Sequence, residues 1–172
     1  MSVQIGQPAP ELQGQALVNG EIKEFKLSDF RGKNWVVLFF YPLDFTFVCP
    51  TEIRGFNAHY GEFEKLGVKI VGASVDSVYS HKAWVASDLG PLKFPLFADI
   101  TKDASRSYNV LKEEAGIALR GTFIIDDKGV VRSIVVNDLG TGRSVDETLR
   151  TIAALQTGKN TPCEWKPGQS TL

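Results

Sequence analysis

A long apolar segment followed directly by a helix start constrains this fold most. The run Trp35–Tyr41 is apolar throughout, which is typical of a strand buried on both faces of a sheet. Pro50 suits the first turn of a helix, and apolar residues then recur at helical spacing to about position 65. The sequence therefore predicts a central strand over 35–41 that leads into an amphipathic helix over about 50–65.

The remaining segments alternate between strand and helix patterns. Parallel strands joined by helices, followed by an antiparallel pair, predict an α/β protein with a thioredoxin-like fold, in which a mixed central β-sheet is flanked by helices. The expected elements are a hairpin within 1–33, a strand over 68–75, a helix from Ser77, a short strand over 94–98, a short helix over 101–110, strands over 120–125 and 130–136, and a last helix from Ser144 that ends near Gly158.

Length and pattern predict one domain followed by a short tail. A chain of 172 residues can bury a single sizeable core. Beyond Gly158 the periodicity is lost, and this last segment contains Cys163. We therefore expect a domain over 1–158 and a carboxyl-terminal tail over 159–172.

Composition excludes several classes of partner. Nineteen basic and twenty acidic residues give a formal charge of −1 without a basic block, which argues against nucleic acid and against an anionic membrane surface. No apolar stretch approaches the ~20 residues that span a bilayer. The first residues have neither a basic start nor an apolar core, so we expect no signal peptide and a cytoplasmic location. Two cysteines and two histidines give poor support for a metal site.

Cys49 stands where a nucleophile is expected. It lies between the predicted buried strand and the predicted helix, directly before Pro50. Unpaired N–H groups and the positive end of the helix dipole favour a thiolate at such a position. Thr46 precedes Cys49 by one helical turn, so its hydroxyl can point at the same small volume. The pattern predicts a reactive thiol rather than a structural one.

Three separate motifs resemble those of one known family. The segment Phe45-Thr-Phe-Val-Cys-Pro-Thr-Glu52, with Pro42 upstream, resembles the active-site motif of the peroxiredoxins. Ala118-Leu-Arg-Gly-Thr-Phe-Ile-Ile-Asp126 resembles their second motif. Thr161-Pro-Cys-Glu-Trp-Lys-Pro-Gly168 resembles the resolving-cysteine region of the typical two-cysteine branch, which includes the bacterial alkyl hydroperoxide reductase C component.

The resemblance implies a role for each matching side chain. Cys49 matches the peroxidatic cysteine, and Cys163 matches the resolving cysteine, which the partner subunit normally supplies. Thr46 matches the hydroxyl that orients the peroxide, Arg120 matches the guanidinium that stabilises the thiolate and the transition state, and Pro42 matches the residue that shields the thiol from water. Glu52 matches the carboxylate that holds the arginines, and Trp84 matches a packing residue around the site.

The implied activity is that of a thiol-dependent peroxidase in antioxidant defence. It would reduce hydrogen peroxide and organic hydroperoxides through a cysteine sulfenic acid and then an intersubunit disulfide. No metal, flavin or nicotinamide cofactor is implied at this site. The implied electron donor is a dithiol protein, such as a thioredoxin, or a dedicated flavoprotein disulfide reductase.

The resemblance also implies assembly with further copies of the chain. We expect a homodimer that can assemble further into a ring of dimers. Val130–Val136 carries little charge, so we expect it to be an exposed sheet edge that pairs with a second copy. One departure concerns Cys163, which follows Pro162 and stands two positions before Trp165, whereas the family's resolving cysteine usually follows valine and stands further from the tryptophan.

Other functions remain open from the residues alone. A thioredoxin-like disulfide reductase would require a cysteine at position 52, where this chain has Glu52. A cysteine–histidine hydrolase would need His59 or His81 beside the thiol, and we interpret both as ordinary helix residues. A chaperone or scaffold would need no catalysis. Peroxide consumption coupled to dithiol oxidation separates these alternatives.

Overall fold

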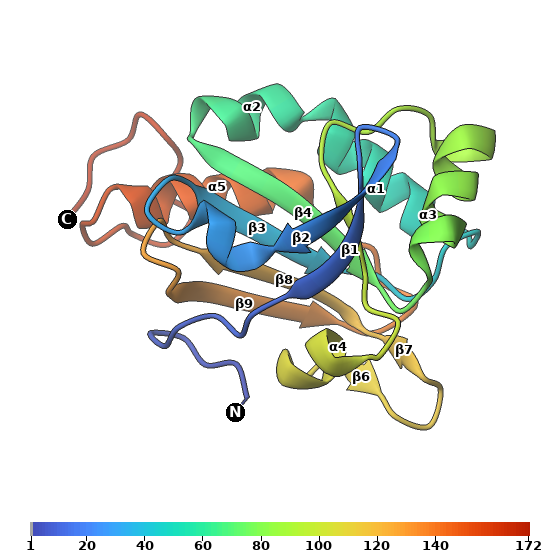
Figure 1. The fold of residues 1–172 in the computed structure, drawn as a ribbon. Helices are drawn as coiled ribbons and strands as arrows, with labels where there is room; N and C mark the ends of the chain where they lie inside the picture. The colour runs from blue at the N-terminus through green and yellow to red at the C-terminus, as the bar shows by residue number, and fades with distance from the viewer. Residues whose placement is uncertain (1) are drawn as a thin grey trace.

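The chain alternates strands and helices around one central sheet (Figure 1). The computed structural model describes residues 2–172. In chain order the elements are β1 (Gln13–Val18), β2 (Glu21–Lys26), a 3₁₀ turn (Leu27–Phe30), β3 (Trp35–Phe40), α1 (Cys49–Ala58), α2 (Tyr60–Lys65), β4 (Val68–Ser74), α3 (Val78–Trp84), a π-helical turn (Val85–Leu89), β5 (Leu96–Ala98), α4 (Asp103–Ser107), β6 (Leu111–Lys112), β7 (Ile117–Ala118), β8 (Arg120–Ile125), β9 (Val131–Asn137) and α5 (Val145–Gln156).

The central sheet has seven strands in the order β2-β1-β5-β4-β3-β8-β9, and β6 and β7 form a separate pair. β4 pairs in parallel with β3 and with β5. β8 pairs antiparallel with β3 and with β9, and β1 pairs antiparallel with β2 and with β5. This mixed sheet with helices on its faces confirms the predicted thioredoxin-like α/β fold.

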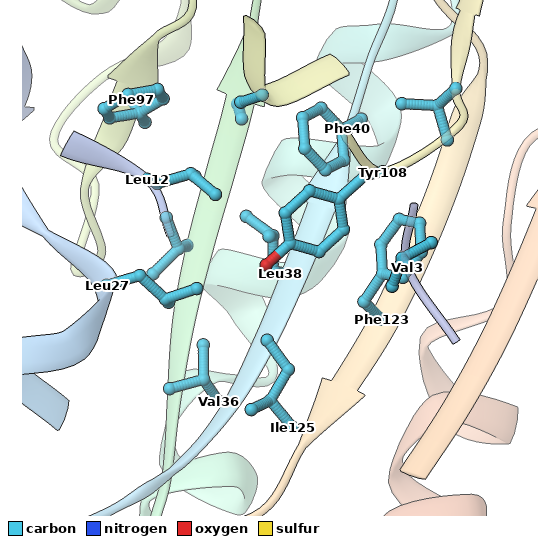
Figure 2. Close-up of a cluster of buried hydrophobic side chains, with 14 of the residues drawn as sticks. Val3, Leu12, Leu27, Val36, Leu38, Phe40, Phe97, Tyr108, Phe123 and Ile125 are labelled. Carbon is cyan, nitrogen blue, oxygen red and sulfur yellow. The ribbon is translucent and has the colours of Figure 1, made fainter. Parts of the chain in front are cut away.

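β3 contributes side chains to both faces of the sheet, because successive residues of a strand point to opposite sides. Val36, Leu38 and Phe40 join the buried cluster on the face that α4 covers (Figure 2). Val37 and Phe39 join the cluster on the other face, beneath α1, α2, α3 and α5. The predicted central strand is therefore confirmed, and its carboxyl end leads through a short loop into α1.

The predicted single helix over about 50–65 is wrong. Two helices cover this segment, and His59 separates them with non-helical backbone angles (φ −95°, ψ 7°). Nδ1 of its imidazole lies 2.8 Å from the carbonyl oxygen of Gly55, so the side chain bonds the same carbonyl as the backbone N–H of His59. Gly61 adds a weak helix former just beyond the break.

The predicted helix over 101–110 is also wrong at both ends, since α4 is shorter. Lys102 and Asn109 adopt left-handed backbone conformations (φ 66° and φ 55°), which an α-helix does not accommodate. The short strand expected over 94–98 begins only at Leu96. The two-residue strands β6 and β7 have no periodicity and were not predicted.

From Arg120 onward the elements follow the prediction closely. The hydroxyl of Ser144 accepts a hydrogen bond from the backbone N–H of Glu147 and caps α5, as the capping box predicts. β9 is the last strand of the sheet, which confirms the predicted edge strand, and Val135 is 52% exposed there. Within residues 2–172, no helix is both long and apolar enough to cross a membrane.

Candidate active site

Cys49 is the first residue of α1, and its side chain is fully buried. β3 ends at Phe40, and the loop that follows returns the chain to the sheet at the start of the helix. Val48 is the N-cap residue, and among the described residues no side chain caps this helix end. The positive end of the helix dipole is therefore available to a thiolate on Cys49.

Arg120 contacts the sulfur directly. Its Nη1 donates to Sγ of Cys49 at 3.3 Å, and its Nε donates to the carbonyl of Leu139 at 2.7 Å. Arg120 begins β8, and the antiparallel pairing of β8 with β3 places this residue beside the end of β3. Sheet pairing thus brings the guanidinium to the cysteine from far along the chain.

Glu52 links Arg120 to a second arginine. Its carboxylate accepts from Nη1 of Arg120 at 2.8 Å and from Nε and Nη2 of Arg143, each at 3.0 Å. The side chains of Glu52 and both arginines are at most 5% exposed. Two guanidinium groups and one carboxylate leave one positive charge unbalanced in a buried site. Negative charge that develops at the sulfur or on a departing oxygen lies against this excess positive charge and is stabilised by it.

Arg143 is a site residue that the sequence analysis missed. Nη2 donates to the carbonyl of Phe40 at 2.6 Å, Nη1 donates to that of Gly121 at 2.8 Å, and the guanidinium lies 5.1 Å above the ring of Phe39. Burial lowers the pKa of Arg143, while the ion pair with Glu52 opposes this effect. One local signal was present, because an arginine directly before a helix N-cap stands against the helix dipole.

Thr46 and Pro42 lie in the loop ahead of Cys49. Pro42 is buried, and Thr46 is half-buried. The hydroxyl of Thr46 donates to the carbonyl of Leu43 at 2.9 Å rather than to the sulfur. Its oxygen lone pairs can therefore accept a hydrogen bond from a peroxide O–H.

Trp84 packs against this loop. Its side chain is fully buried, and the centroid of its ring lies 5.8 Å from that of Phe45 and 6.0 Å from that of Tyr41. Nε1 donates to a carboxylate oxygen of Asp88 at 3.3 Å. Trp84 is therefore placed for packing, whereas Arg120 and Cys49 are placed for chemistry.

The expectation that His81 is an ordinary helix residue is wrong. Its ring is fully buried, with Nδ1 2.7 Å from the carboxylate of Asp44 and Nε2 3.1 Å from the carbonyl of Phe97. The Asp44 carboxylate also accepts from the hydroxyls of Tyr41 and Ser80, each at 2.8 Å. Both ring nitrogens face oxygen atoms, so His81 is not directed at the thiol. Through Asp44 it anchors the loop that precedes Cys49.

Cys163 lies apart from this cluster. Both cysteines are free thiols, and Cys163 is exposed whereas Cys49 is buried. The tail around it is anchored by Trp165, which is 4% exposed and whose carbonyl accepts from Nη1 of Arg150 at 3.0 Å. The structure thus brings together Cys49, Arg120 and Glu52 but leaves Cys163 outside the site.

Within residues 2–172, no group of histidine, cysteine, aspartate and glutamate side chains is arranged to hold a metal ion.

Comparison with known proteins gives consistent matches. The model of the AhpC/TSA family matches residues 5–134. Peroxiredoxin-2 of Rattus norvegicus is 56% identical, over 98% of this chain and 89% of that protein. The chloroplastic 2-Cys peroxiredoxin BAS1 of Spinacia oleracea is 51% identical, over 98% of this chain and 67% of that protein.

Solved structures agree with these sequence matches. The reduced 2-Cys peroxiredoxin of Plasmodium vivax superposes with a TM-score of 0.93 at 40% identity, covering 96% of this chain and 91% of that one. AhpC of Enterococcus faecalis superposes with a TM-score of 0.86 at 36% identity, covering 91% of this chain and 94% of that one.

Proposed function

We propose, on the premise that this chain belongs to the AhpC/TSA family and to its 2-Cys peroxiredoxins, that Cys49 attacks the peroxide and Cys163 resolves the product. The chain is a thiol-dependent peroxidase. The observation that carries the assignment of Cys49 is the Nη1 group of Arg120, which lies 3.3 Å from its sulfur and also bonds Glu52.

In the first step, the Cys49 thiolate attacks the terminal oxygen of a hydroperoxide. The S–O bond forms while the O–O bond breaks, and the leaving oxygen departs as hydroxide or alkoxide, which takes a proton from solvent. Negative charge builds on that oxygen in the transition state, where Arg120 and the first N–H groups of α1 can stabilise it. The products are a sulfenic acid on Cys49 and water or an alcohol.

In the second step, the thiolate of Cys163 attacks the sulfenic sulfur. The S–S bond forms, the S–O bond breaks, and hydroxide leaves and becomes water after protonation. An external thiol reductant then returns both cysteines to the reduced state. For this chain we propose a dithiol protein or a flavoprotein disulfide reductase, and a panel of purified reductants that differ in class identifies which one supports turnover.

Thr46, Pro42 and Trp84 are proposed as supporting residues. Thr46 orients the peroxide through the acceptor oxygen of its hydroxyl, since the donor already bonds Leu43. Pro42 shields the thiol from water, and Trp84 holds the loop in place by packing. Glu52 and Arg143 position Arg120, and they do not contact the reacting atoms.

Oligomerisation of the 2-Cys type is expected for a member of this branch, and we propose its surfaces here. The exposed edge of β9 suits pairing with the same strand of a second copy. Phe45 and Phe47 are 58% and 93% exposed in the active-site loop itself, and they suit a second contact that joins dimers into a ring. Sedimentation of the reduced protein measures both states, and Val135→Lys should lower the dimer fraction.

The tail over 159–172 is proposed as a separate functional segment that carries the resolving thiol of a domain over 1–158. A cytoplasmic location is proposed because two free thiols suit a reducing compartment. Cell fractionation tests the location, and the relatives named chloroplastic are the comparison for an organelle.

The decisive experiment measures peroxide consumption with a dithiol reductant in the parent protein and in Cys49→Ser and Cys163→Ser. We expect Cys49→Ser to abolish the reaction and Cys163→Ser to keep one rapid oxidation of Cys49. Insulin reduction, ester hydrolysis and aggregation suppression are assayed in parallel as tests of the alternative functions. Near-normal turnover by Cys49→Ser would contradict the proposal.

A further inference from the structure

The two cysteines lie in opposite environments, and this determines what must move during turnover. Cys49 is fully buried at the start of α1, while Cys163 is exposed in the tail. A disulfide requires the two Cα atoms to come within about 7 Å of each other. On the function proposed above, Cys49 must leave its buried position, and the first turn of α1 is the segment that carries it.

Hydrogen bonds join α1 to the segment that follows α3, and Figure 1 shows where both elements lie. Nη2 of Arg54 donates to the carboxylate of Asp88 at 2.9 Å and to its carbonyl at 3.1 Å. One turn further along α1, Nδ2 of Asn57 donates to the carbonyl of Pro91 at 3.3 Å. Oδ1 of Asn57 accepts from the backbone N–H of Lys93 at 2.9 Å. These bonds hold the middle of α1 just beyond the turn that must open.

Asp88 connects α1 with Trp84, which packs against the loop that precedes Cys49. One carboxylate oxygen accepts from Arg54, and the other accepts from Nε1 of Trp84. The ring of Trp84 packs on that of Phe45, which lies in the loop before Cys49. The π-helical turn Val85–Leu89 directs both the carboxylate and the carbonyl of Asp88 to α1, and such turns are frequent at functional sites.

This contact lies outside the catalytic cluster. The first turn of α1 is also held by Glu52, but that residue fixes Arg120 at the sulfur, so its loss would disturb the chemistry. The pair formed by Arg54 and Asp88 is about half exposed and does not contact the thiol or its arginines. Removal of the Arg54 side chain should therefore change the opening of the helix without changing the attack on peroxide.

We propose that Asp88 and Arg54 are positioning residues that hold α1 in its folded form and so set the fate of oxidised Cys49. While the helix is folded, the sulfenate can attack a second peroxide: another S–O bond forms, the O–O bond breaks, and the departing oxygen takes a proton, which leaves a sulfinic acid. Once the helix opens, the Cys163 thiolate can form the disulfide instead. Opening is a local unfolding, so a contact that stabilises the folded form favours sulfinic acid.

The opening can be measured without peroxide. In Cys163→Ser the sole thiol is Cys49, and its alkylation by iodoacetamide reports how often the buried sulfur becomes accessible. We expect Asp88→Ala and Arg54→Ala each to accelerate alkylation by about two- to fivefold, as for loss of an exposed ion pair. The double variant should be no faster than Asp88→Ala, because each single variant already removes the contact between the two side chains. Arg54→Lys, which keeps the charge, should fall between.

The control is Glu113→Ala, which removes a comparable exposed ion pair with Arg106 (2.8 Å) away from α1. In Arg54→Ala with both cysteines present, rapid mixing with peroxide should show an unchanged rate of first oxidation, faster disulfide formation, and less sulfinic acid per turnover. Asp88→Ala also loses the bond from Trp84, and it should show the same shift from sulfinic acid to disulfide. Alkylation and disulfide formation at parental rates in Asp88→Ala and Arg54→Ala would overturn the inference. Failure of peroxide to oxidise Cys49 even in the parent would refute the proposed function, and the alkylation rates would still decide the role of Asp88.

Discussion

Arg143 reaches both carboxylate oxygens of Glu52, with Nε and Nη2 each at 3.0 Å, and neither side chain is more than 4% exposed. Glu52 lies in the first turn of α1, whereas Arg143 precedes α5. The same carboxylate also bonds Arg120, which contacts the sulfur of Cys49. The arrangement of both guanidinium groups around the thiol therefore depends on one acidic residue.

Glu52→Gln should destabilise the protein strongly. The substitution keeps the size of the side chain but leaves two buried guanidinium groups without a counter-charge. Breaking a buried ion pair in this way costs about 3–5 kcal/mol in free energy of unfolding. Denaturant unfolding of the reduced proteins measures the loss. Glu113→Gln, at an exposed ion pair, is the control and should cost less than about 1 kcal/mol. Equal losses in the two variants would argue against a central role for Glu52.

Arg120→Gln should slow the first oxidation of Cys49. The guanidinium is the fixed positive donor nearest the sulfur, and removing one donor of this kind reduces a rate by about 10²- to 10³-fold. Stopped-flow mixing of the reduced variant with peroxide gives the bimolecular rate. Arg132→Gln changes an arginine at the partly exposed hairpin and should retain the parental rate. A parental rate in Arg120→Gln would remove the electrostatic role assigned to this residue.

Mild oxidation should produce a covalent dimer that needs both cysteines. Cys49 is buried in its own site and Cys163 is exposed in the tail, which suits transfer of the resolving thiol between subunits. A non-reducing gel after peroxide treatment should show the dimer band in the parent and in neither Cys49→Ser nor Cys163→Ser. If mass spectrometry instead detects a monomer with an internal disulfide, Cys49 and Cys163 bond within one subunit, and the prediction of an intersubunit disulfide is wrong.

Asp126 should make the hairpin between β8 and β9 sensitive to acid. Burial raises the pKa of Asp126. Hydrogen bonds from the N–H group of Val130, from Arg132 and from the N–H group of Lys128 lower it by more than burial raises it, so the net pKa lies below the ordinary value. A lowered pKa in the folded state stabilises the fold above the unfolded pKa of about 3.9, and this stabilisation is lost as the pH falls through the folded value.

Asp126→Asn should therefore cost about 1–2 kcal/mol at neutral pH, and the difference from the parent should shrink below about pH 4. Urea unfolding at several pH values measures this difference. Asp127→Asn alters the exposed neighbour in the same turn and should leave stability nearly unchanged. A cost for Asp126→Asn that stays constant down to low pH would show that shape, not charge, is responsible.

The core strand and the last helix could be predicted because their signals are local. A continuous apolar run identifies β3, and a capping box with apolar residues at helical spacing identifies α5. The predicted bounds of α1 and α4 were wrong because a single side chain or backbone angle ended each helix. His59 bonds the carbonyl of Gly55 and ends α1, and Lys102 and Asn109 shorten α4 by adopting positive φ angles.

The sequence by itself determined that Cys49 stands between a buried strand and a helix start, because neighbouring residues alone create that junction. Arg120 was recognised from its motif, and its contact with the sulfur follows from the pairing of β8 with β3. Only the tertiary structure revealed Arg143 as the second arginine on Glu52 and His81 as the buried partner of Asp44. The partner of a charged side chain depends on which distant segments the sheet brings together, and the periodicity of a single chain does not contain that information.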